Sequence, residues 1–274
     1  MRGTSRASLA YARERLAEIL AGPASADPGA ERLGDELFAV TGLLDNQVRL
    51  RRILSDPSRD ASARQTLATG LLRGKVSGPA LDVVTALVGS NWSRPADLAD
   101  ATEQLGVLAV AEAADNEGLL DDVEDELFRF GRVVNAEPQL RIALSDPFIA
   151  ADRKNELLRS LLGGKVAEPT MRLITQAADH PRGRSLDASL EEYARLAAER
   201  RERLVAEVHV AIVLTDEQRG RLRAALTATY GRDVHLNVVL DPRAIGGMSV
   251  QISDEIIDGT VAGRLAELRR RMTA

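Results

Sequence analysis

The chain repeats its own sequence at a fixed offset of 90 residues. DELFAVTGLLDNQVRLRRILSDP at residues 35–57 aligns with DELFRFGRVVNAEPQLRIALSDP at 125–147, and LLRGKVSGP at 71–79 aligns with LLGGKVAEP at 161–169. From residue 35 to residue 88, 19 of the 54 aligned positions are identical, without a gap. A tandem duplication of a module of about ninety residues explains this agreement, and it predicts the same local structure in both copies.

Both copies have the apolar spacing of helices. In the first copy, apolar residues recur three and four positions apart and form one stripe, made of Leu9, Ala12, Leu16, Ile19 and Leu20. We expect a second helix from about Glu31 to Leu54. It ends before Pro57, because a proline disfavours helical geometry in the residue before it.

The remaining helices follow from caps and prolines. A third helix ends near Gly74, which is a suitable C-terminal cap, and a fourth has Pro79 in its first turn, where proline is tolerated. A long helix begins near Ala96. The second copy repeats this plan and closes with a helix from Leu186 to about Arg203. The short connections indicate antiparallel helices packed in a bundle.

After Arg203 the apolar period falls from 3.6 residues to 2. Alternation over residues 208–214, 234–240 and 248–252 predicts strands with one buried face. Thr215 and Gln218 have the spacing of a capping box at the start of a helix. Residues 256–257 indicate a short further strand, and Thr260 can cap a final helix.

The predicted fold is therefore α+β. An N-terminal all-α helical bundle, built from the duplicated module, is followed by a small C-terminal α/β domain with the order β-α-β-β-α. The expected domains are residues 1–100, the first helical module, residues 101–203, the second, and residues 204–274, the α/β domain. Aromatic residues make up only 3% of the chain, so aliphatic side chains must fill the cores.

The glycine pair Gly246-Gly247 lies between two alternating segments. We interpret it as the turn of a hairpin, where glycine allows a positive φ. A phosphate-binding loop would instead lead from a strand into the N-terminus of a helix. The acids Asp254, Glu255 and Asp258 lack the regular spacing of a calcium loop. Since the chain also has no cysteine, we expect no cofactor and no metal.

No catalytic residue is expected either. His180, His209 and His235 have no carboxylate or second histidine at ligand spacing, and no nucleophile motif accompanies them. The net charge of -5 disfavours a nucleic-acid binder. No stretch is apolar for long enough to cross a bilayer, so we expect no direct membrane insertion. Trp92, the sole tryptophan, is either a buried anchor or an interface hot spot.

The C-terminal segment LDPRAIGGMSVQISDEIIDGTVAGRLAELRRRM, residues 240–272, resembles the signature of the δ subunit of bacterial F-type ATP synthases. This family includes the mitochondrial oligomycin-sensitivity-conferring protein. The positions that match its motif are Asp241, Pro242, Ile245, Gly246, Gly247, Val250, Ile257, Asp258, Gly259, Thr260, Arg264, Leu265 and Leu268. In the second module, ALSDPFIAADRKNELLRSLLGGK looks like the family's helical segment, with Lys154 at the expected lysine. The resemblance covers residues 105–274, and the extra first module looks like that of long actinobacterial δ subunits.

The resemblance implies a structural role without catalysis. The family's helical domain binds the N-terminal helices of α subunits at the catalytic head, and its C-terminal domain binds the C-terminal helix of the b subunit. Such a subunit belongs to the stator at the cytoplasmic face of the cell membrane, where it stops the head from turning with the rotor. The physical requirement is a rigid body with helix-in-groove contacts.

By analogy with the family, the α-subunit groove lies between the first and fifth helices of a module. The candidate contacts are Leu105, Leu108, Leu173 and Ala177 in the second copy, and Leu9, Leu16, Leu81 and Val88 in the first. Each of these residues can equally belong to the core, and the sequence does not say which module makes the contact.

A helical-repeat adaptor with an RNA-binding α/β domain is the alternative function. Residues 204–274 hold nine arginines and nine acidic residues, so this segment has no basic excess. A KH-type module would also need its clamping loop between two helices. Both points favour the stator role.

Overall fold

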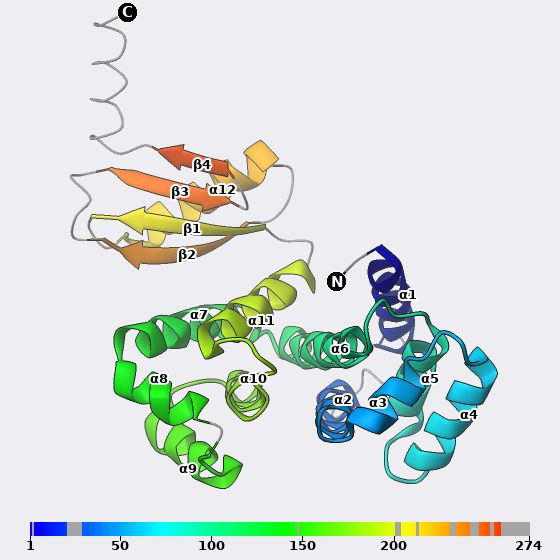
Figure 1. Ribbon diagram of the computed structural model, residues 1–274. Helices are drawn as coiled ribbons and strands as arrows, with labels where there is room; N and C mark the ends of the chain where they lie inside the picture. Colours follow the sequence, from blue (N-terminus) through cyan, green and yellow to red (C-terminus); the bar gives the residue numbers. More distant parts are fainter. Residues whose placement is uncertain are drawn as a thin grey trace, which may run out of the picture. The chain divides into compact units, whose positions relative to one another are not determined.

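The computed structural model describes residues 1, 3–20, 29–146, 148–200, 204–211, 214–230, 234–241, 247–252 and 255–258. The chain forms two compact units, Met1–Ala197 and Ala198–Ala274. The first unit is helical and the second is built on a sheet, as Figure 1 shows. The α+β class predicted from the sequence is confirmed.

The helices of the first unit follow the repeat. The first module contains α1 (Gly3–Leu20), α2 (Gly29–Asn46), α3 (Val48–Leu54), α4 (Ala61–Leu72), α5 (Gly78–Gly89) and α6 (Pro95–Asn116). The second contains α7 (Leu120–Ala136), α8 (Pro138–Ser145), α9 (Ala151–Leu162), α10 (Glu168–Asp179) and α11 (Leu186–Arg200). The bounds of α4 and α9 differ by exactly the repeat offset of 90 residues, which shows that both copies fold alike.

The single helix expected over residues 31–54 is wrong, because the chain breaks it at Gln47. This residue has φ -110° and ψ 71°, outside the helical region. The break frees the carbonyl of Leu44, which accepts a hydrogen bond of 3.2 Å from Nη1 of Arg51 instead. In the second copy, Glu137 breaks the helix at the equivalent position, just before Pro138. The break therefore occurs in both copies of the module. Only the second copy has a proline there, so proline is not required for the break.

The caps expected from the sequence are confirmed. Gly74 has a φ of 76° just after α4, and Gly164 has a φ of 69° after α9. These are left-handed conformations, which glycine adopts without a steric penalty. Pro79 lies in the first turn of α5, where Ser77 accepts a hydrogen bond from the amide of Ala80.

Helix α6 joins the two modules into one unit. It is the last helix of the first copy and the first helix of the second, and it lies between the two groups of helices in Figure 1. Along its length both apolar and polar residues are buried, including Leu98, Leu105, Glu103 and Glu112. The expected boundary between residues 100 and 101 falls inside this helix, and the division of the chain into three domains stays a prediction.

The second unit has a mixed four-stranded sheet. Its described elements are β1 (Leu204–Val210), α12 (Asp216–Tyr230), β2 (Val234–Leu240), β3 (Met248–Ile252) and β4 (Glu255–Asp258), and the strand order is β2-β1-β3-β4. Strand β1 pairs with β2 in parallel and with β3 antiparallel. Ala206, Val208 and Val210 of β1 are buried with Leu226 of α12, so the helix covers this face.

The hairpin expected at the glycine pair is wrong. Strand β1 lies between β2 and β3, so the connection that contains Gly247 crosses β1 instead of joining two neighbouring strands. Alternation along a strand shows which face is buried and carries no information about which strand is its neighbour. The positive φ expected there is confirmed, since Gly247 has a φ of 84°.

Other features of this unit agree with the sequence. The amide of Thr215 donates to Oε1 of Gln218 at 2.9 Å, and the amide of Gln218 donates to the Thr215 hydroxyl at 3.3 Å, which is the predicted capping box. Residues 256–257 lie in β4 as expected.

Five residues of the family motif lie among the described residues, namely Asp241, Gly247, Val250, Ile257 and Asp258. The amide of Asp241 donates to the carbonyl of Val210 at 2.9 Å, Gly247 precedes β3, and Asp258 pairs in register with Ser249. The final helix expected from Thr260 lies outside the described residues. So do eight motif residues, namely Pro242, Ile245, Gly246, Gly259, Thr260, Arg264, Leu265 and Leu268.

Candidate partner-binding surfaces

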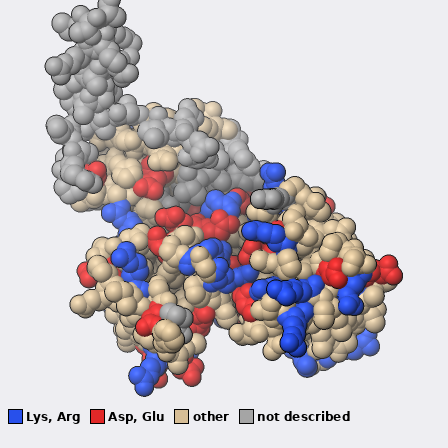
Figure 2. Space-filling model, viewed as in Figure 1, with Lys and Arg blue, Asp and Glu red and all other residues tan. Residues whose placement is uncertain are grey.

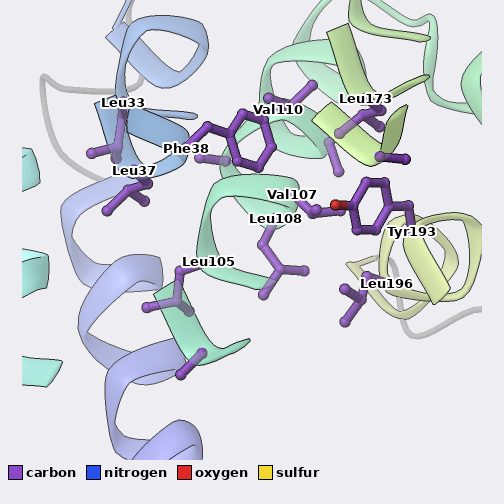
Figure 3. Packing of buried hydrophobic residues seen from close by; sticks show 14 of the residues in the cluster. Leu33, Leu37, Phe38, Leu105, Val107, Leu108, Val110, Leu173, Tyr193 and Leu196 are labelled. Atoms are coloured by element: carbon purple, nitrogen blue, oxygen red, sulfur yellow. The ribbon is translucent and has the colours of Figure 1, made fainter. Parts of the chain in front are cut away.

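The predicted groove of the second module is formed by buried residues. Leu105 and Leu108 lie on α6, and Leu173 and Ala177 lie on α10; all four are buried in the core of the helical unit. Figure 3 shows Leu173 of α10 and Phe38 of α2 near Val110 of α6. The four candidate residues of the second module are therefore covered by other helices of the same chain.

Contacts along most of α2 bring it against both helices of this groove. A Cβ on Gly34 would lie 2.6 Å from Cγ2 of Val110 in α6. At the next turn, a Cβ on Gly106 would lie 2.6 Å from the ring of Phe38. Gly42 faces the end of α10, where a Cβ would lie 3.2 Å from Cε1 of His180. The two glycines Gly34 and Gly106 let α2 and α6 approach more closely than larger residues would allow.

An ion pair fixes α2 to α10 directly. Arg172 of α10 donates one guanidinium nitrogen to Glu31 and another to Asp35, both on α2. Arg172 lies 137 residues after Asp35 and 141 residues after Glu31 in the sequence. Together with the close contact between α2 and α6, this ion pair connects the first module to α10.

The equivalent face of the first module, between α1 and α5, is more open. Leu16 and Val88 are buried, whereas Leu9 and Leu81 are only partly buried. Tyr11 lies one turn before Arg15 on α1 and is 55% exposed. Nη2 of Arg15 lies 4.0 Å from Asp82, which is next to Leu81 on α5. We call Tyr11 and Leu81 the α1–α5 face.

A buried carboxylate on α6 connects this helix to α11 and to the loop before it. Glu103 has no exposed surface; it accepts a hydrogen bond of 2.8 Å from the hydroxyl of Tyr193 on α11 and one of 2.5 Å from Nη2 of Arg184. Burial and the nearby charge of Glu103 hold the pKa of Tyr193 well above its ordinary value, so the phenol remains a proton donor. The carboxylate is thus paired and hydrogen-bonded, as a buried charge requires.

Arg182 extends this network to α2. It sits in the loop between α10 and α11, where its Nη2 lies 2.7 Å from Asp100 of α6 and its Nε lies 3.4 Å from Asp45 of α2. Burial raises the pKa of Asp100, against the opposing charges of Arg182 and Arg184. Arg182 also has a φ of 53°, a left-handed conformation that is unfavourable for a residue with a side chain. The surrounding carboxylates hold the loop in this conformation.

Each module contains a glutamate that caps its fifth helix, and the sequence analysis did not identify either one. Glu36 of α2 accepts hydrogen bonds from the amide of Ser77 at 3.0 Å and from its hydroxyl at 2.5 Å. Glu126 of α7 accepts from the amide of Ala167 at 2.9 Å and from the hydroxyl of Thr170 at 2.5 Å. The signal was present, since both glutamates belong to the repeated DELF motif.

The pKa of Glu36 predicts a pH-dependent contribution to stability. Burial works against its ionisation, but the hydrogen bonds from Ser77 and Arg32 outweigh burial and lower the pKa of Glu36. Its contribution is therefore complete above the unfolded value of about 4.3 and is lost as the pH falls through the lower folded value. We expect Glu36→Gln to lower the free energy of unfolding by about 1–2 kcal/mol at pH 7.

Urea unfolding, followed through the fluorescence of Trp92, measures this change across a series of pH values. The difference between the native chain and Glu36→Gln must shrink as the pH is lowered below about 4. Glu18→Gln is a suitable control, because its side chain is 66% exposed and it pairs only with an exposed arginine. A difference for Glu36→Gln that is the same at every pH would contradict the prediction.

Two remaining alternatives from the sequence are settled by the structure. Trp92 is 4% exposed and its Nε1 donates to the carbonyl of Leu87 at 2.8 Å, so it is a buried anchor in this chain. The expectation that His209 has no nearby carboxylate is wrong, because its Nε2 lies 2.8 Å from Glu207 on the same face of β1. Both side chains are more than a third exposed, which is typical of a surface pair.

Within the described part of the chain, no three His, Cys, Asp or Glu side chains are arranged to hold a metal ion. Nor is any described helix long and apolar enough to span a membrane.

The family model described as "ATP synthase delta (OSCP) subunit" matches residues 107–272. The match begins inside α6, so it covers the second module and the C-terminal unit and leaves out α1 to α5.

Similar proteins match the first module as well. ATP synthase subunit delta of Streptomyces avermitilis is 51% identical over 272 residues, which cover 99% of this chain and 98% of that protein. The protein of the same name from Thermobifida fusca is 46% identical over 99% of both chains. That of Acidothermus cellulolyticus is 44% identical over the full length of both. The duplicated module is therefore shared with these relatives.

Proposed function

The chain belongs to the ATP synthase delta (OSCP) subunit family, and we propose that it is a non-catalytic subunit of the peripheral stalk of an F-type, proton-translocating ATP synthase. In this role it links the catalytic head to the b-subunit stalk and keeps the head from rotating with the rotor. It is held at the cytoplasmic face of the cell membrane through the rest of the complex. The identity to full-length δ subunits is the observation that supports the proposal most strongly.

The helical unit has the stiffness that this role requires. A part that resists torque must transmit force without changing shape, which favours extensive buried contacts within a single body. Helix α6 is common to both modules, and buried hydrogen bonds connect Glu103 to α11 and to the loop before it. The Arg172 ion pairs connect α10 to α2. These links resist motion of one module against the other.

We assign the contact with the α-subunit N-terminal helices to the α1–α5 face of the first module. The matching residues of the second module, Leu105, Leu108, Leu173 and Ala177, are all buried in the core and offer no surface to a partner helix. On the first module, Tyr11 of α1 and Leu81 of α5 keep apolar surface accessible, whereas Leu9 packs against the core. Leu16 and Val88 lie beneath it in the core. An amphipathic helix placed on this face would bury that apolar surface.

The C-terminal unit carries the contact with the C-terminal helix of the b subunit in this proposal. Its sheet keeps two large apolar residues accessible among the described positions, Leu240 of β2 and Ile257 of β4. The two partners then bind separate units of the chain, so each binds without excluding the other.

Titration calorimetry on the full chain tests this assignment with two peptides, the N-terminal helix of the α subunit and the C-terminal helix of the b subunit. Each is expected to bind, and saturation with one is expected to leave the affinity for the other unchanged. The double variant Tyr11→Ala, Leu81→Ala is expected to weaken the α peptide about tenfold, because it removes exposed apolar anchors. The b peptide should bind this variant normally.

Met171→Ala is the matched control, because Met171 occupies the position of Leu81 in the second module. It is expected to change the affinity for the α peptide less than twofold, well below the tenfold change that corresponds to about 1.4 kcal/mol. If Met171→Ala weakens binding and the first-module variant does not, the second module makes the contact. If neither peptide produces heat, the proposed function fails.

A further inference from the structure

The first module has a second apolar surface, on α2, α3 and α4. Leu43, Leu67 and Leu71 are 37%, 37% and 36% exposed, which is unusual for three leucines on neighbouring helices. Leu67 and Leu71 are one turn apart on α4, and Leu43 and Leu71 border the same cavity. Leu50 of α3 lines this cavity as well. We call Leu43, Leu50, Leu67 and Leu71 the α3–α4 strip.

The cavity beneath the strip is apolar. Its lining comes from five helices, α2 to α6, and includes Leu54, Leu87 and Leu98. The only polar side chain in the lining is Thr102, whose hydroxyl already donates to the carbonyl of Leu98 at 2.9 Å. The cavity has a volume of about 10 Å³, and its lining offers no free polar group to a water molecule. An apolar group is therefore the better occupant.

The rim of the strip carries positive charge. Residues 43–76 contain seven Arg and Lys against three Asp, although the whole chain has a net charge of -5. Arg49 and Arg52 flank Leu50 on α3, and Arg73 and Lys75 follow the end of α4; all four are exposed. Among the described residues, none of these four side chains forms an ion pair. Figure 2 shows Lys and Arg atoms gathered over the part of the surface where Figure 1 places α3 and α4.

The repeat provides a comparison for this charge. In the second module, residues 133–166 occupy the equivalent positions and keep exposed apolar residues at Val133, Ile142 and Leu161. They contain five Arg and Lys against four Asp and Glu, so the segment is close to neutral. The two modules therefore share an apolar surface, but three of the four rim cations of the first module are replaced by uncharged residues in the second, at Gln139, Ile142 and Gly163.

We propose that the α3–α4 strip binds an amphipathic helix of a partner protein, with leucine-like residues on one face and carboxylates along its edges. The apolar face covers Leu43, Leu67 and Leu71, and the carboxylates approach the exposed cations on both sides. This pairing places opposite charges together at the rim of the contact, where they guide association and select the partner. The strip is distinct from the α1–α5 face, and the inference does not depend on the proposed function.

Two labelled helical peptides with the same leucine face test the inference on the full chain. One carries glutamates on its polar face and the other carries lysines. In fluorescence anisotropy at low salt, the acidic peptide is expected to bind with a Kd at least tenfold below that of the basic peptide. Raising the salt to 0.3 M is expected to weaken the acidic peptide several-fold, because the charges lie on an exposed rim. Equal affinity for the two peptides would overturn the inference.

Paired variants locate the binding. Leu71→Gln and Arg49→Glu, Arg52→Glu are each expected to weaken the acidic peptide about tenfold, through the apolar face and the charged rim respectively. The charge variant changes exposed side chains only, so it stays informative if Leu71→Gln fails to fold. Leu161→Gln, the equivalent change in the second module, is expected to leave the affinity unchanged.

Tyr11→Ala, Leu81→Ala is expected to leave this binding unchanged as well, which separates the strip from the α-subunit contact. If Leu161→Gln or the α1–α5 variant weakens the acidic peptide as much as Leu71→Gln does, the peptide binds elsewhere and the inference is wrong.

Discussion

Replacement of Glu103 by leucine is expected to lower the free energy of unfolding of the helical unit by about 3–5 kcal/mol. The carboxylate is fully buried and binds both the Arg184 guanidinium and the Tyr193 hydroxyl. Its removal leaves a partly buried arginine without its charge partner and a buried hydroxyl without an acceptor. In the folded variant, both groups are removed from water and gain no hydrogen-bond partner in return. Urea unfolding followed by Trp92 fluorescence measures the loss.

A second variant separates the lost charge from the lost packing. Glu103→Leu combined with Arg184→Met and Tyr193→Phe removes all three polar groups and keeps most of their volume. It is expected to recover a large part of the loss, since replacement of a whole buried ionic cluster by apolar residues is often close to neutral. If the urea concentration at the unfolding midpoint of Glu103→Leu equals that of the native chain, this network does not stabilise the helical unit.

Gly34→Val is expected to lower the free energy of unfolding by about 2–3 kcal/mol, because it overpacks the contact between α2 and α6. A Cβ at this position would lie 2.6 Å from Cγ2 of Val110 and 3.2 Å from the carbonyl oxygen of Gly106. The second of these atoms belongs to the backbone and cannot rotate away. The helices must therefore separate, and the apolar contacts of Phe38 on α6 weaken with them.

Gly70→Ala provides the control for the change in helix propensity. Gly70 lies in α4, it is exposed, and a Cβ there would meet nothing within 4 Å. This variant is expected to stabilise the chain by about 0.5–1 kcal/mol, because alanine favours the helix over glycine. A neutral or stabilising effect of Gly34→Val would show that α2 and α6 do not pack as closely as the structure places them.

The partner-binding residues show where inference from sequence stops. The spacing of Leu105, Leu108, Leu173 and Ala177 correctly identifies the apolar side of each helix. It does not distinguish a face covered by a partner from a face covered by another part of the same chain. The answer depends on which helices meet across the fold, and all four residues are buried within this chain. Likewise, the repeated DELF motif marks Glu36 and Glu126 without indicating that they cap α5 and α10.

By itself, the sequence determined the local structure of this protein. The repeat at 90 residues, the helical apolar spacing, the prolines and the capping residues placed most helices. Alternation placed β2 and β3, whereas the strand expected over residues 208–214 is wrong in its bounds, since β1 spans Leu204–Val210. These signals suffice because each depends on backbone preferences and burial within a few consecutive residues.

Only the tertiary structure decided the break at Gln47, the position of β1 between β2 and β3, and the close packing of α2 on α6. At the break, the side chain of Arg51 donates a hydrogen bond to the carbonyl of Leu44. In the other two, the outcome is set by which faces meet across the fold, and that depends on shape and charge complementarity between segments that no local pattern relates.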